Sequence, residues 1–174
     1  IDFSKKAILE SKGTGLDIGC GGLIQTYEQY GKTKNEFILL DNSIEMLKVG
    51  KSRLDSLNSQ TLENIHLLQA NAFELPFDND CFDHVSSFGV LHIFDRKRAF
   101  IREALRVLKP GGCFYFTSLT SDRGLSRRYM SFLRSQGEFG EPMSSRKTLQ
   151  LFDHTINLDW YIKGSMLFVS GEKA

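Results

Sequence analysis

The sequence predicts an α/β fold in which a doubly wound, mostly parallel sheet ends in an antiparallel hairpin. First, short apolar runs alternate with helical patterns along most of the 174 residues, as in parallel strands joined by crossover helices. Second, the run Phe37–Leu40 has no polar alternation, which is typical of a strand covered on both faces. Third, the patterns Thr155–Ile162 and Ser165–Ser170 leave only Lys163 and Gly164 between them, which favours a tight turn.

Size and composition indicate a single domain, expected to span residues 1–174. The chain is long enough to form a core without disulfides or metals, and its 41% hydrophobic and 25% charged residues are ordinary for a soluble globular protein. The net charge of +1 argues against a general nucleic-acid or anionic-membrane surface. No apolar run reaches the roughly 18–20 residues that cross a bilayer, and no signal peptide is visible. Because the chain begins at Ile1 and not at Met, the expectation allows for a further N-terminal segment upstream of the given sequence.

The cysteines and histidines predict no metal site. Cys20, Cys81 and Cys113 are odd in number, scattered, and not spaced as zinc ligands or as a CxxC redox pair, so we expect reduced thiols in a cytoplasmic protein. The histidines outside the candidate site are widely separated along the pattern, which argues against metal binding. They are His66, His84 and His154.

The first half of the chain predicts three strands with helices between them. Glycines end the first helix, and Ser43 is a good N-cap for the helix that follows the second strand. The expected elements are, in order, a helix over Phe3–Lys12, a strand at Gly15–Ile18, a helix over Leu23–Tyr30, a strand at Phe37–Leu40, a helix over Ile44–Leu57 and a strand at Ile65–Gln69.

The second half predicts two more parallel strands before the hairpin. A strand over Phe82–Phe88 is followed by an amphipathic helix over Phe94–Leu108. The Lys109–Gly112 segment, Lys-Pro-Gly-Gly, reads as a stop signal before the fifth strand at Cys113–Leu119. A polar, arginine-bearing segment and a helix around Ser145–Phe152 then lead to the hairpin.

The stretch Leu16–Leu23, sequence LDIGCGGL, predicts the floor of a site for a nucleotide-like cofactor. Its glycines let the backbone take positive φ and let a ligand approach closely. Asp41 follows a buried strand about 20 residues beyond the glycines, where an acid binds ribose hydroxyls. A dinucleotide site uses the same acid, but Ile24 occupies the place of the last Gly/Ala in GxGxxG, which argues against a dehydrogenase.

Five motifs together resemble those of class I S-adenosylmethionine-dependent methyltransferases. LDIGCGG is similar to the first motif and LLDNSIEML to the second. ANAFELPFDNDCFDHV resembles the third motif running into the fourth strand, SSFGVLH its exit, and EALRVLKPGG the helix and turn before strand five. The resemblance implies a Rossmann-like methyltransferase fold with a seven-stranded sheet, whose antiparallel last strand explains the terminal hairpin.

The resemblance also implies S-adenosylmethionine as cofactor, with S-adenosylhomocysteine as product. Asp17 would help to hold the ammonium group, Asp41 would accept both ribose hydroxyls, and Asn71 with the N–H of Ala72 would read the adenine edge. The glycine loop would face the methionine end of the cofactor, and Asn42 and Met46 would flank the adenine. Ser87 and Phe88, at the exit of strand four, would lie beside the sulfonium. The implied cofactor residues are Asp17, Gly19, Cys20, Gly21, Asp41, Asn42, Met46, Asn71, Ala72, Phe73, Ser87 and Phe88.

Two positions depart from the family pattern. Leu23 stands where a third glycine is usual, so we expect Gly22 to substitute for it with an altered turn. Asn71 stands where an aspartate is common, and its carbonyl can still accept a hydrogen bond from the adenine amino group. Neither departure removes the predicted site.

The predicted activity is methyl transfer to a small molecule by in-line displacement, achieved mainly through positioning. His92 follows strand four and is either a general base or a pocket-shaping histidine. The arginines after strand five favour either an anionic substrate or a solvated helix face; they are Arg123, Arg127, Arg128 and Arg134. An RNA or protein methyltransferase and a non-catalytic binding protein are the alternatives.

Overall fold

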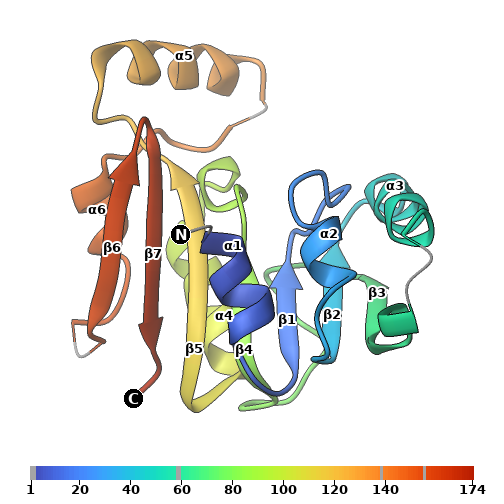
Figure 1. The fold of residues 1–174 in the computed structure, drawn as a ribbon. Coiled ribbons are helices and arrows are strands. Elements are labelled where there is room, and N and C mark those ends of the chain that lie inside the picture. Colours follow the sequence, from blue (N-terminus) through green and yellow to red (C-terminus); the bar gives the residue numbers. More distant parts are fainter. Residues whose placement is uncertain (1–2, 58–59, 138, 155) are drawn as a thin grey trace.

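The computed structural model describes residues 3–57, 60–137, 139–154 and 156–174, which form a seven-stranded sheet with helices on both faces (Figure 1). The predicted fold class is confirmed. The strands are β1 (Gly15–Ile18), β2 (Phe37–Asp41), β3 (Ile65–Gln69), β4 (Phe82–Ser87), β5 (Leu108–Leu119), β6 (Leu158–Lys163) and β7 (Met166–Glu172). The helices are α1 (Phe3–Lys5), η1 (Lys6–Glu10), α2 (Tyr27–Tyr30), α3 (Ile44–Asp55), η2 (Gln60–Asn64), η3 (Leu91–Ile93), α4 (Lys97–Val107), α5 (Gly124–Ser135) and α6 (Ser145–Leu149).

The strand order is β3-β2-β1-β4-β5-β7-β6. Successive strands are added in one direction from β1 to β3 and in the opposite direction from β4 onward, so the order reverses between β1 and β4. The chain moves outward from β1 to β3 and then returns to β4 on the other side of β1. Strands β1 to β5 pair in parallel, whereas β7 pairs antiparallel with both β5 and β6. In a sheet of this kind ligands bind beyond the carboxyl ends of the strands at the reversal point.

Two apolar layers bury the two faces of the sheet. On one face Phe100 and Ala104 of α4 pack with Phe114 and Phe116 of β5. On the other face Ile8, Leu23, Tyr30, Phe37, Leu39 and Leu54 form a second cluster. Because both faces are covered, β1 is buried at every position, as the unbroken apolar run in its neighbour β2 predicts.

Helix α5 belongs to neither layer. Figure 1 shows it across the carboxyl end of the sheet, above β5 and the β6–β7 hairpin. It lies within the segment that the sequence marks only as polar and arginine-bearing. Of its residues, Met130 is buried, whereas Tyr129 and Phe132 are each 59% exposed.

Several predicted boundaries differ from the structure for local physical reasons. The helix expected over Leu23–Tyr30 is reduced to α2, because Leu23 has a φ of 58° and cannot begin a helix. The stop signal before strand five lies inside β5, since Gly111 donates a hydrogen bond to the Lys173 carbonyl and Gly112 accepts one from Lys173. The C-terminal end of β7 therefore draws the Pro-Gly-Gly segment into the sheet.

The remaining differences are small shifts at element ends. Strands β2, β6 and β7 extend beyond their predicted ends, to Asp41, Lys163 and Glu172, whereas α3 and β4 end early, at Asp55 and Ser87. The N-terminal helix ends at Glu10, the helix after the fourth strand begins at Lys97, and the helix after α5 ends at Leu149. The hairpin strands begin at Leu158 and Met166, and Thr155, the predicted start of the hairpin, lies outside the described residues. Strands β1 and β3 have the predicted bounds.

Candidate cofactor and acceptor site

The carboxyl ends of β1, β4 and β5 surround a cavity of about 330 Å³. The glycine loop after β1 forms one wall, the exit of β4 another, and the end of β5 a third. Among its lining residues are Asp17, Gly19, Cys20, Phe88, His92 and Thr117. The sequence predicts the first four of these as cofactor residues and His92 as either a general base or a pocket-shaping histidine.

The glycine loop turns away from β1 through three left-handed residues. Gly19, Gly21 and Leu23 have φ values of 73°, 54° and 58°. A Cβ atom on Gly19 would lie 2.6 Å from the Val90 side chain, whereas one on Gly21 would meet nothing within 4 Å. The space beside Gly21 is therefore open for a ligand that approaches the backbone closely.

Leu23 keeps the backbone course that a glycine would give. A non-glycine residue in the left-handed region costs roughly 1–2 kcal/mol. The Leu23 side chain is only 2% exposed and packs under α3, where a Cβ on Gly50 would lie 3.1 Å from Leu23 Cγ. Burial of this side chain offsets the backbone cost. Gly22 does not have a positive φ, and its carbonyl accepts a hydrogen bond from Arg53.

Asp17 lines the cavity and has a buried carboxylate oxygen that lacks a hydrogen-bond partner among the described residues. Its Oδ2 accepts a hydrogen bond from the Tyr30 hydroxyl at 2.7 Å, while Oδ1 is buried and has no hydrogen-bond partner among the described residues. Burial raises the pKa of Asp17 to about 7, against the opposing effect of the Tyr30 hydrogen bond. A cationic donor at Oδ1 would supply the missing partner, so this residue fits the ammonium group of the implied cofactor.

Asp41 ties the glycine loop to the start of α3. Its Oδ2 accepts a hydrogen bond from the Gly21 N–H at 2.8 Å, and its Oδ1 accepts one from the Ser43 N–H at 2.9 Å. An ionised carboxylate has about four lone-pair positions. Acceptor positions therefore remain on both oxygens for a diol such as ribose.

The residues predicted to hold adenine lie beyond the ends of β2 and β3. Asn42 and Met46 are exposed at the start of α3, and the Asn42 carbonyl accepts a hydrogen bond from Gln69. Asn71 is exposed, and its Oδ1 accepts a hydrogen bond from the Phe73 N–H at 3.0 Å. One lone pair of that carbonyl is therefore already engaged by the turn that Asn71 forms.

Ala72 and Phe73 are half-buried at the same turn. The Phe73 ring packs edge-on against Phe94 with centroids 4.7 Å apart, and the Arg96 guanidinium lies 4.6 Å from its centroid. These contacts fix the orientation of the ring beside the predicted adenine position.

The two residues at the exit of β4 differ in placement. Ser87 is fully buried, and its hydroxyl donates to the Ile18 carbonyl at 2.8 Å, so that hydroxyl is engaged by β1. Phe88 lines the cavity and packs edge-on against Phe3, with centroids 6.5 Å apart. Cys20 also lines the cavity, and burial raises the pKa of its thiol, with the carboxylates of Asp17 and Asp41 adding to the effect.

His92 lies on η3, which follows the exit of β4, and lines the cavity. Its Nδ1 accepts a hydrogen bond from the Leu119 N–H at 3.1 Å, and the ring packs on Phe139 with centroids 4.7 Å apart. Burial lowers the pKa of His92 to about 4, and the charge of Lys97 contributes. The imidazole is therefore neutral near pH 7.

Thr117 is a cavity residue that the sequence analysis missed. Its side chain is 6% exposed, and its Oγ1 accepts a hydrogen bond from the Gly89 N–H at 2.7 Å. A single threonine in an apolar strand carries no local signal of function. Its only sequence indication is its place near the end of a predicted parallel strand.

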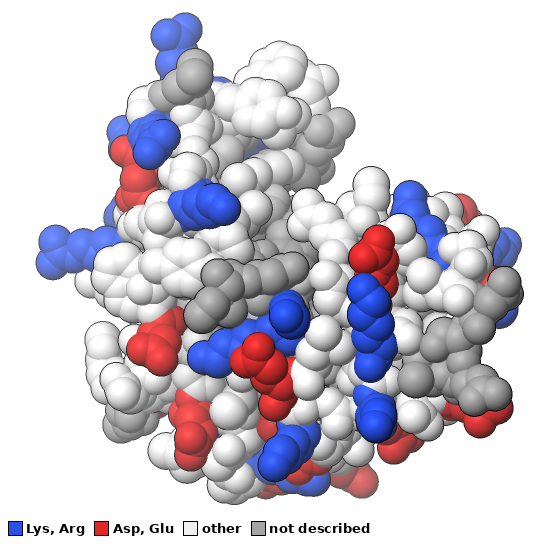
Figure 2. All heavy atoms as spheres, viewed as in Figure 1, with Lys and Arg blue, Asp and Glu red and all other residues white. Residues whose placement is uncertain are grey.

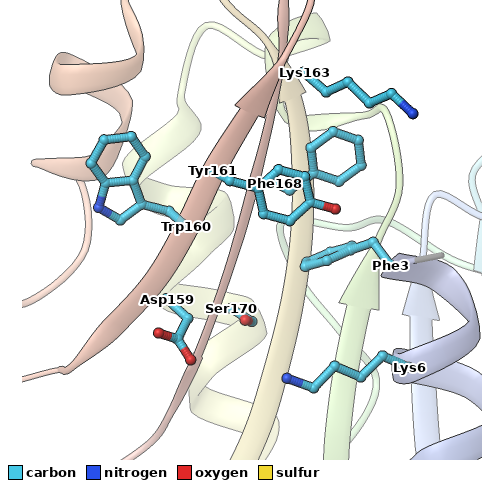
Figure 3. Close-up of a pocket in the computed structure, with 8 residues that line it drawn as sticks. All are labelled: Phe3, Lys6, Asp159, Trp160, Tyr161, Lys163, Phe168 and Ser170. Carbon is cyan, nitrogen blue, oxygen red and sulfur yellow. The ribbon is translucent and has the colours of Figure 1, made fainter. Parts of the chain in front are cut away.

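A larger hollow of about 870 Å³ lies elsewhere, between α1 and the β6–β7 hairpin. Figure 3 shows the overlapping rings of Tyr161 and Phe168 facing Phe3, with Lys6 and Lys163 at its two ends. None of the predicted cofactor residues lines it. The smaller cavity is therefore the candidate site, because it lies at the carboxyl ends of the parallel strands and is lined by predicted cofactor residues, whereas the larger hollow is not.

The described part of the chain holds no group of three or more His, Cys, Asp or Glu residues that could bind a metal ion. Cys20, Cys81 and Cys113 are free. Within the same ranges no helix is both long and apolar enough to span a membrane.

Comparison with solved structures shows the fold. A methyltransferase-like structure from Bacillus halodurans C-125, described as a putative methyltransferase, has a TM-score of 0.79 at 14% identity, covering 98% of this chain and 96% of that one. Geranyl diphosphate C-methyltransferase from Streptomyces coelicolor A3(2), solved with Mg²⁺, geranyl diphosphate and S-adenosyl-L-homocysteine, has a TM-score of 0.74 at 15% identity, covering 94% and 71%.

Comparison of sequences shows the family. The ubiquinone/menaquinone biosynthesis C-methyltransferase UbiE of Pectobacterium atrosepticum is 41% identical over 95 residues, which are 54% of this chain and 37% of that protein. The chain thus spans little more than a third of the length of this curated relative. A family model described as a methyltransferase domain matches residues 16–116, more than half of the chain. The chain therefore belongs to this family of methyltransferase domains.

Proposed function

We propose that the protein transfers the methyl group of S-adenosylmethionine to a small-molecule acceptor. The observation that carries this proposal is the buried Oδ1 of Asp17, which has no partner among the described residues and belongs to a residue that lines the cavity beside an open glycine loop. A buried polar atom without a partner costs free energy unless a ligand supplies one. A cationic amino group meets that need.

The other cofactor contacts follow from the same frame. Asp41 would accept the ribose hydroxyls while its bonds to Gly21 and Ser43 hold the loop and α3 in register. Phe73, fixed by Phe94 and Arg96, would form an apolar wall for the adenine, with Asn71 and Ala72 at its edge. Asn42 and Met46 would cover the adenine from the exposed start of α3.

The chemistry of the step is supplied by the bound cofactor, whose sulfonium makes its methyl group an excellent target for displacement. The residues of this chain then need only to align the acceptor with that methyl group and to exclude water. Phe88, Leu119 and Met166 give the cavity apolar walls on the acceptor side. Removal of the sulfonium charge on transfer makes a separate acid unnecessary.

A small-molecule acceptor is favoured by the relatives and by the surface. UbiE is named for ubiquinone and menaquinone biosynthesis, and the Streptomyces enzyme was solved with geranyl diphosphate, which is anionic. Lys and Arg are interspersed with Asp and Glu over the face in Figure 2, in keeping with the net charge of +1. The face in Figure 2 shows no continuous basic stripe of the kind that favours an RNA acceptor. The free thiols suit the reducing cytoplasm, which we propose as the location.

The proposal is tested by calorimetric titration of the purified protein with S-adenosylmethionine and with S-adenosylhomocysteine. We expect saturable binding of both at micromolar to low millimolar concentration. Absence of heat and of thermal stabilisation at millimolar cofactor would contradict it. A metabolite screen that detects S-adenosylhomocysteine release then separates a methyltransferase from a protein that only binds the cofactor.

A further inference from the structure

Two buried polar side chains line the cavity at the ends of β4 and β5. His92 and Thr117 are each only 6% exposed, and both line the cavity. They come from different elements, η3 and β5, which meet where the Leu119 N–H bonds to the His92 ring. What each side chain can offer a ligand depends on which of its polar positions the protein already uses.

The His92 ring is held in one tautomer by the backbone. Its Nδ1 accepts the Leu119 N–H at 3.1 Å, so this nitrogen carries the lone pair and no proton. A neutral imidazole has one N–H, which must then be on Nε2. His92 therefore presents a hydrogen-bond donor, and it has no lone pair left with which to act as a general base.

Thr117 is constrained in the same way. Its Oγ1 accepts the Gly89 N–H at 2.7 Å, which uses an acceptor position of the hydroxyl. The hydroxyl hydrogen can rotate toward a ligand, and no described residue accepts it. Gly89 has a φ of 75°, so the exit of β4 takes a left-handed turn at the residue whose N–H reaches Thr117.

We propose that the Nε2–H of His92 and the Oγ1–H of Thr117 form a two-donor site for a negatively charged oxygen of the acceptor substrate, conjugated to the atom that is methylated. This inference rests on the proposed function. The backbone N–H groups of Leu119 and Gly89 occupy the acceptor positions of both side chains and so fix both as donors. A cavity wall that offers donors on one side selects an oxygen anion over a cationic amine.

Such a site removes the need for a base on the protein. Hydrogen bonds to the charged form of an enol or phenol lower its pKa, so the substrate binds as the anion. The acceptor atom forms its bond to the methyl carbon with its own electron pair, while the carbon–sulfur pair remains on sulfur. Methylation of a conjugated carbon converts the oxyanion into a neutral carbonyl. Where that carbon carries a hydrogen, the hydrogen leaves to water as a proton, its bonding pair restores the C=C bond, and the oxygen becomes an anion again that takes up a proton from water. Methylation of the oxygen itself consumes its charge directly.

The tautomer can be measured on the free protein. Two-bond ¹H–¹⁵N correlation spectra of the ¹⁵N-labelled protein report which ring nitrogen carries the proton, and loss of the signal in His92→Asn assigns it. We expect Nε2 to be protonated and Nδ1 not. An Nδ1–H tautomer or an imidazolium at pH 7 would overturn the proposal, whatever the cofactor result.

The donor site is tested with 4-nitrophenolate on protein saturated with S-adenosylhomocysteine, against 4-nitroanisole of similar shape. In His92→Asn the amide oxygen can still accept the Leu119 N–H, but no donor reaches the Nε2 position, whereas His92→Gln restores one. Thr117→Val removes the hydroxyl, and Thr117→Ser keeps it. We expect the Asn and Val variants to bind 4-nitrophenolate about 10- to 100-fold more weakly, and the Gln and Ser variants within about threefold of the native protein.

The outcomes separate the two proposals. Equal affinity for 4-nitrophenolate and 4-nitroanisole, no binding of either, or equal losses in the conservative variants would overturn the donor site. If S-adenosylhomocysteine binds in those cases, the proposed function stands without it. If the cofactor does not bind, the proposed function fails, and the spectra still decide the tautomer.

Discussion

Asp17 combines burial, one hydrogen bond from Tyr30 and one oxygen without a partner among the described residues. Because burial raises its pKa to about 7, the carboxyl is mostly protonated at pH 6 and mostly ionised at pH 8. Only the ionised form attracts an ammonium group. The affinity of the cofactor should therefore depend on pH through this residue.

We predict that S-adenosylhomocysteine binds more tightly as pH rises from 5.5 to 7.5, by at most about tenfold per pH unit below the pKa of Asp17. In Asp17→Asn the amide oxygen still accepts the Tyr30 hydroxyl, so we expect weaker binding with little dependence on pH. Calorimetric titration at several pH values measures this. A pH dependence that survives in the Asn variant would show that another group is responsible.

Asp41 has a structural and a binding role at once, because both its oxygens already accept backbone N–H groups. We predict that Asp41→Ala weakens S-adenosylhomocysteine binding by about 100-fold or more, since it removes charge-assisted bonds to ribose and loosens the loop at Gly21. The exposed Asp55 at the end of α3, the helix that follows Asp41, provides the control, and Asp55→Ala should bind within about twofold. Similar losses in both variants would show that the ribose is placed wrongly.

At the scale of the element, the glycine loop and α3 are matched through one pair of residues. Leu23 holds the left-handed conformation, and Gly50 leaves room for its side chain. A Cβ on Gly50 would lie 3.1 Å from Leu23 Cγ and 3.3 Å from the Gly21 carbonyl oxygen. The helix thus carries a glycine in its interior, which costs about 0.8–1 kcal/mol relative to alanine.

We predict that Gly50→Ala and Leu23→Ala are not additive. In the native background the added methyl group meets Leu23, whereas in Leu23→Ala it gains helix propensity without that contact. The effect of Gly50→Ala on the free energy of unfolding should be more favourable by about 1 kcal/mol in the Leu23→Ala background. Urea denaturation of the four proteins gives this coupling. Glu45→Ala, on the exposed face of α3, should add to Leu23→Ala within about 0.5 kcal/mol.

The elements show which parts of the fold the sequence can predict. The bounds of β1 and β3 follow from short, mainly apolar runs, which are a local pattern, although only β1 is buried at every position and β3 lies at the sheet edge. The start of β5 does not, since Gly111 and Gly112 are drawn into the sheet by Lys173, about 60 residues away. The Lys109–Gly112 segment does follow the end of α4, as predicted, but its pairing with Lys173 makes it part of β5 and not a loop.

The site shows the same difference between features set by local sequence and features set by contacts distant in the sequence. Asp17 and Asp41 lie near strand ends in recognisable motifs. In the structure the Asp17 carboxyl is buried, and the Asp41 carboxyl accepts a hydrogen bond from the Gly21 N–H. Thr117 was missed because its partner, Gly89, is 28 residues away in sequence. The donor character of His92 was missed as well, because it depends on a backbone N–H of another strand.

At the scale of the whole molecule, two titratable groups lie in adjacent strands at the centre of the sheet. Asp17 is in β1, and His84 is in β4, in register with Gly15. Burial lowers the pKa of His84 to about 4, and neither of its ring nitrogens has a hydrogen-bond partner among the described residues. Between pH 4 and 6.5 the folded protein therefore holds both groups mostly neutral, whereas the unfolded chain ionises both.

These two groups affect stability with opposite signs. Between pH 4 and 6.5 the unfolded chain binds more protons than the folded protein at His84, so stability rises with pH. At Asp17 the folded protein binds more protons than the unfolded chain, so stability falls as pH rises toward 7. His92, whose pKa is also lowered to about 4, adds to the effect of His84. In the native protein these opposing contributions to the pH dependence of the free energy of unfolding therefore partly cancel.

We predict that single variants separate these contributions. Asp17→Asn removes the falling contribution, so its free energy of unfolding should rise more steeply from pH 4.5 to 6.5 than that of the native protein. His84→Leu removes a rising contribution, so its profile should be flatter than that of the native protein. Urea denaturation at three pH values in this range measures the slopes, and His66→Leu, at a half-exposed ion pair with Glu36, is the control. Parallel profiles for all four proteins would contradict the prediction, because they would mean that neither buried group changes its protonation on folding.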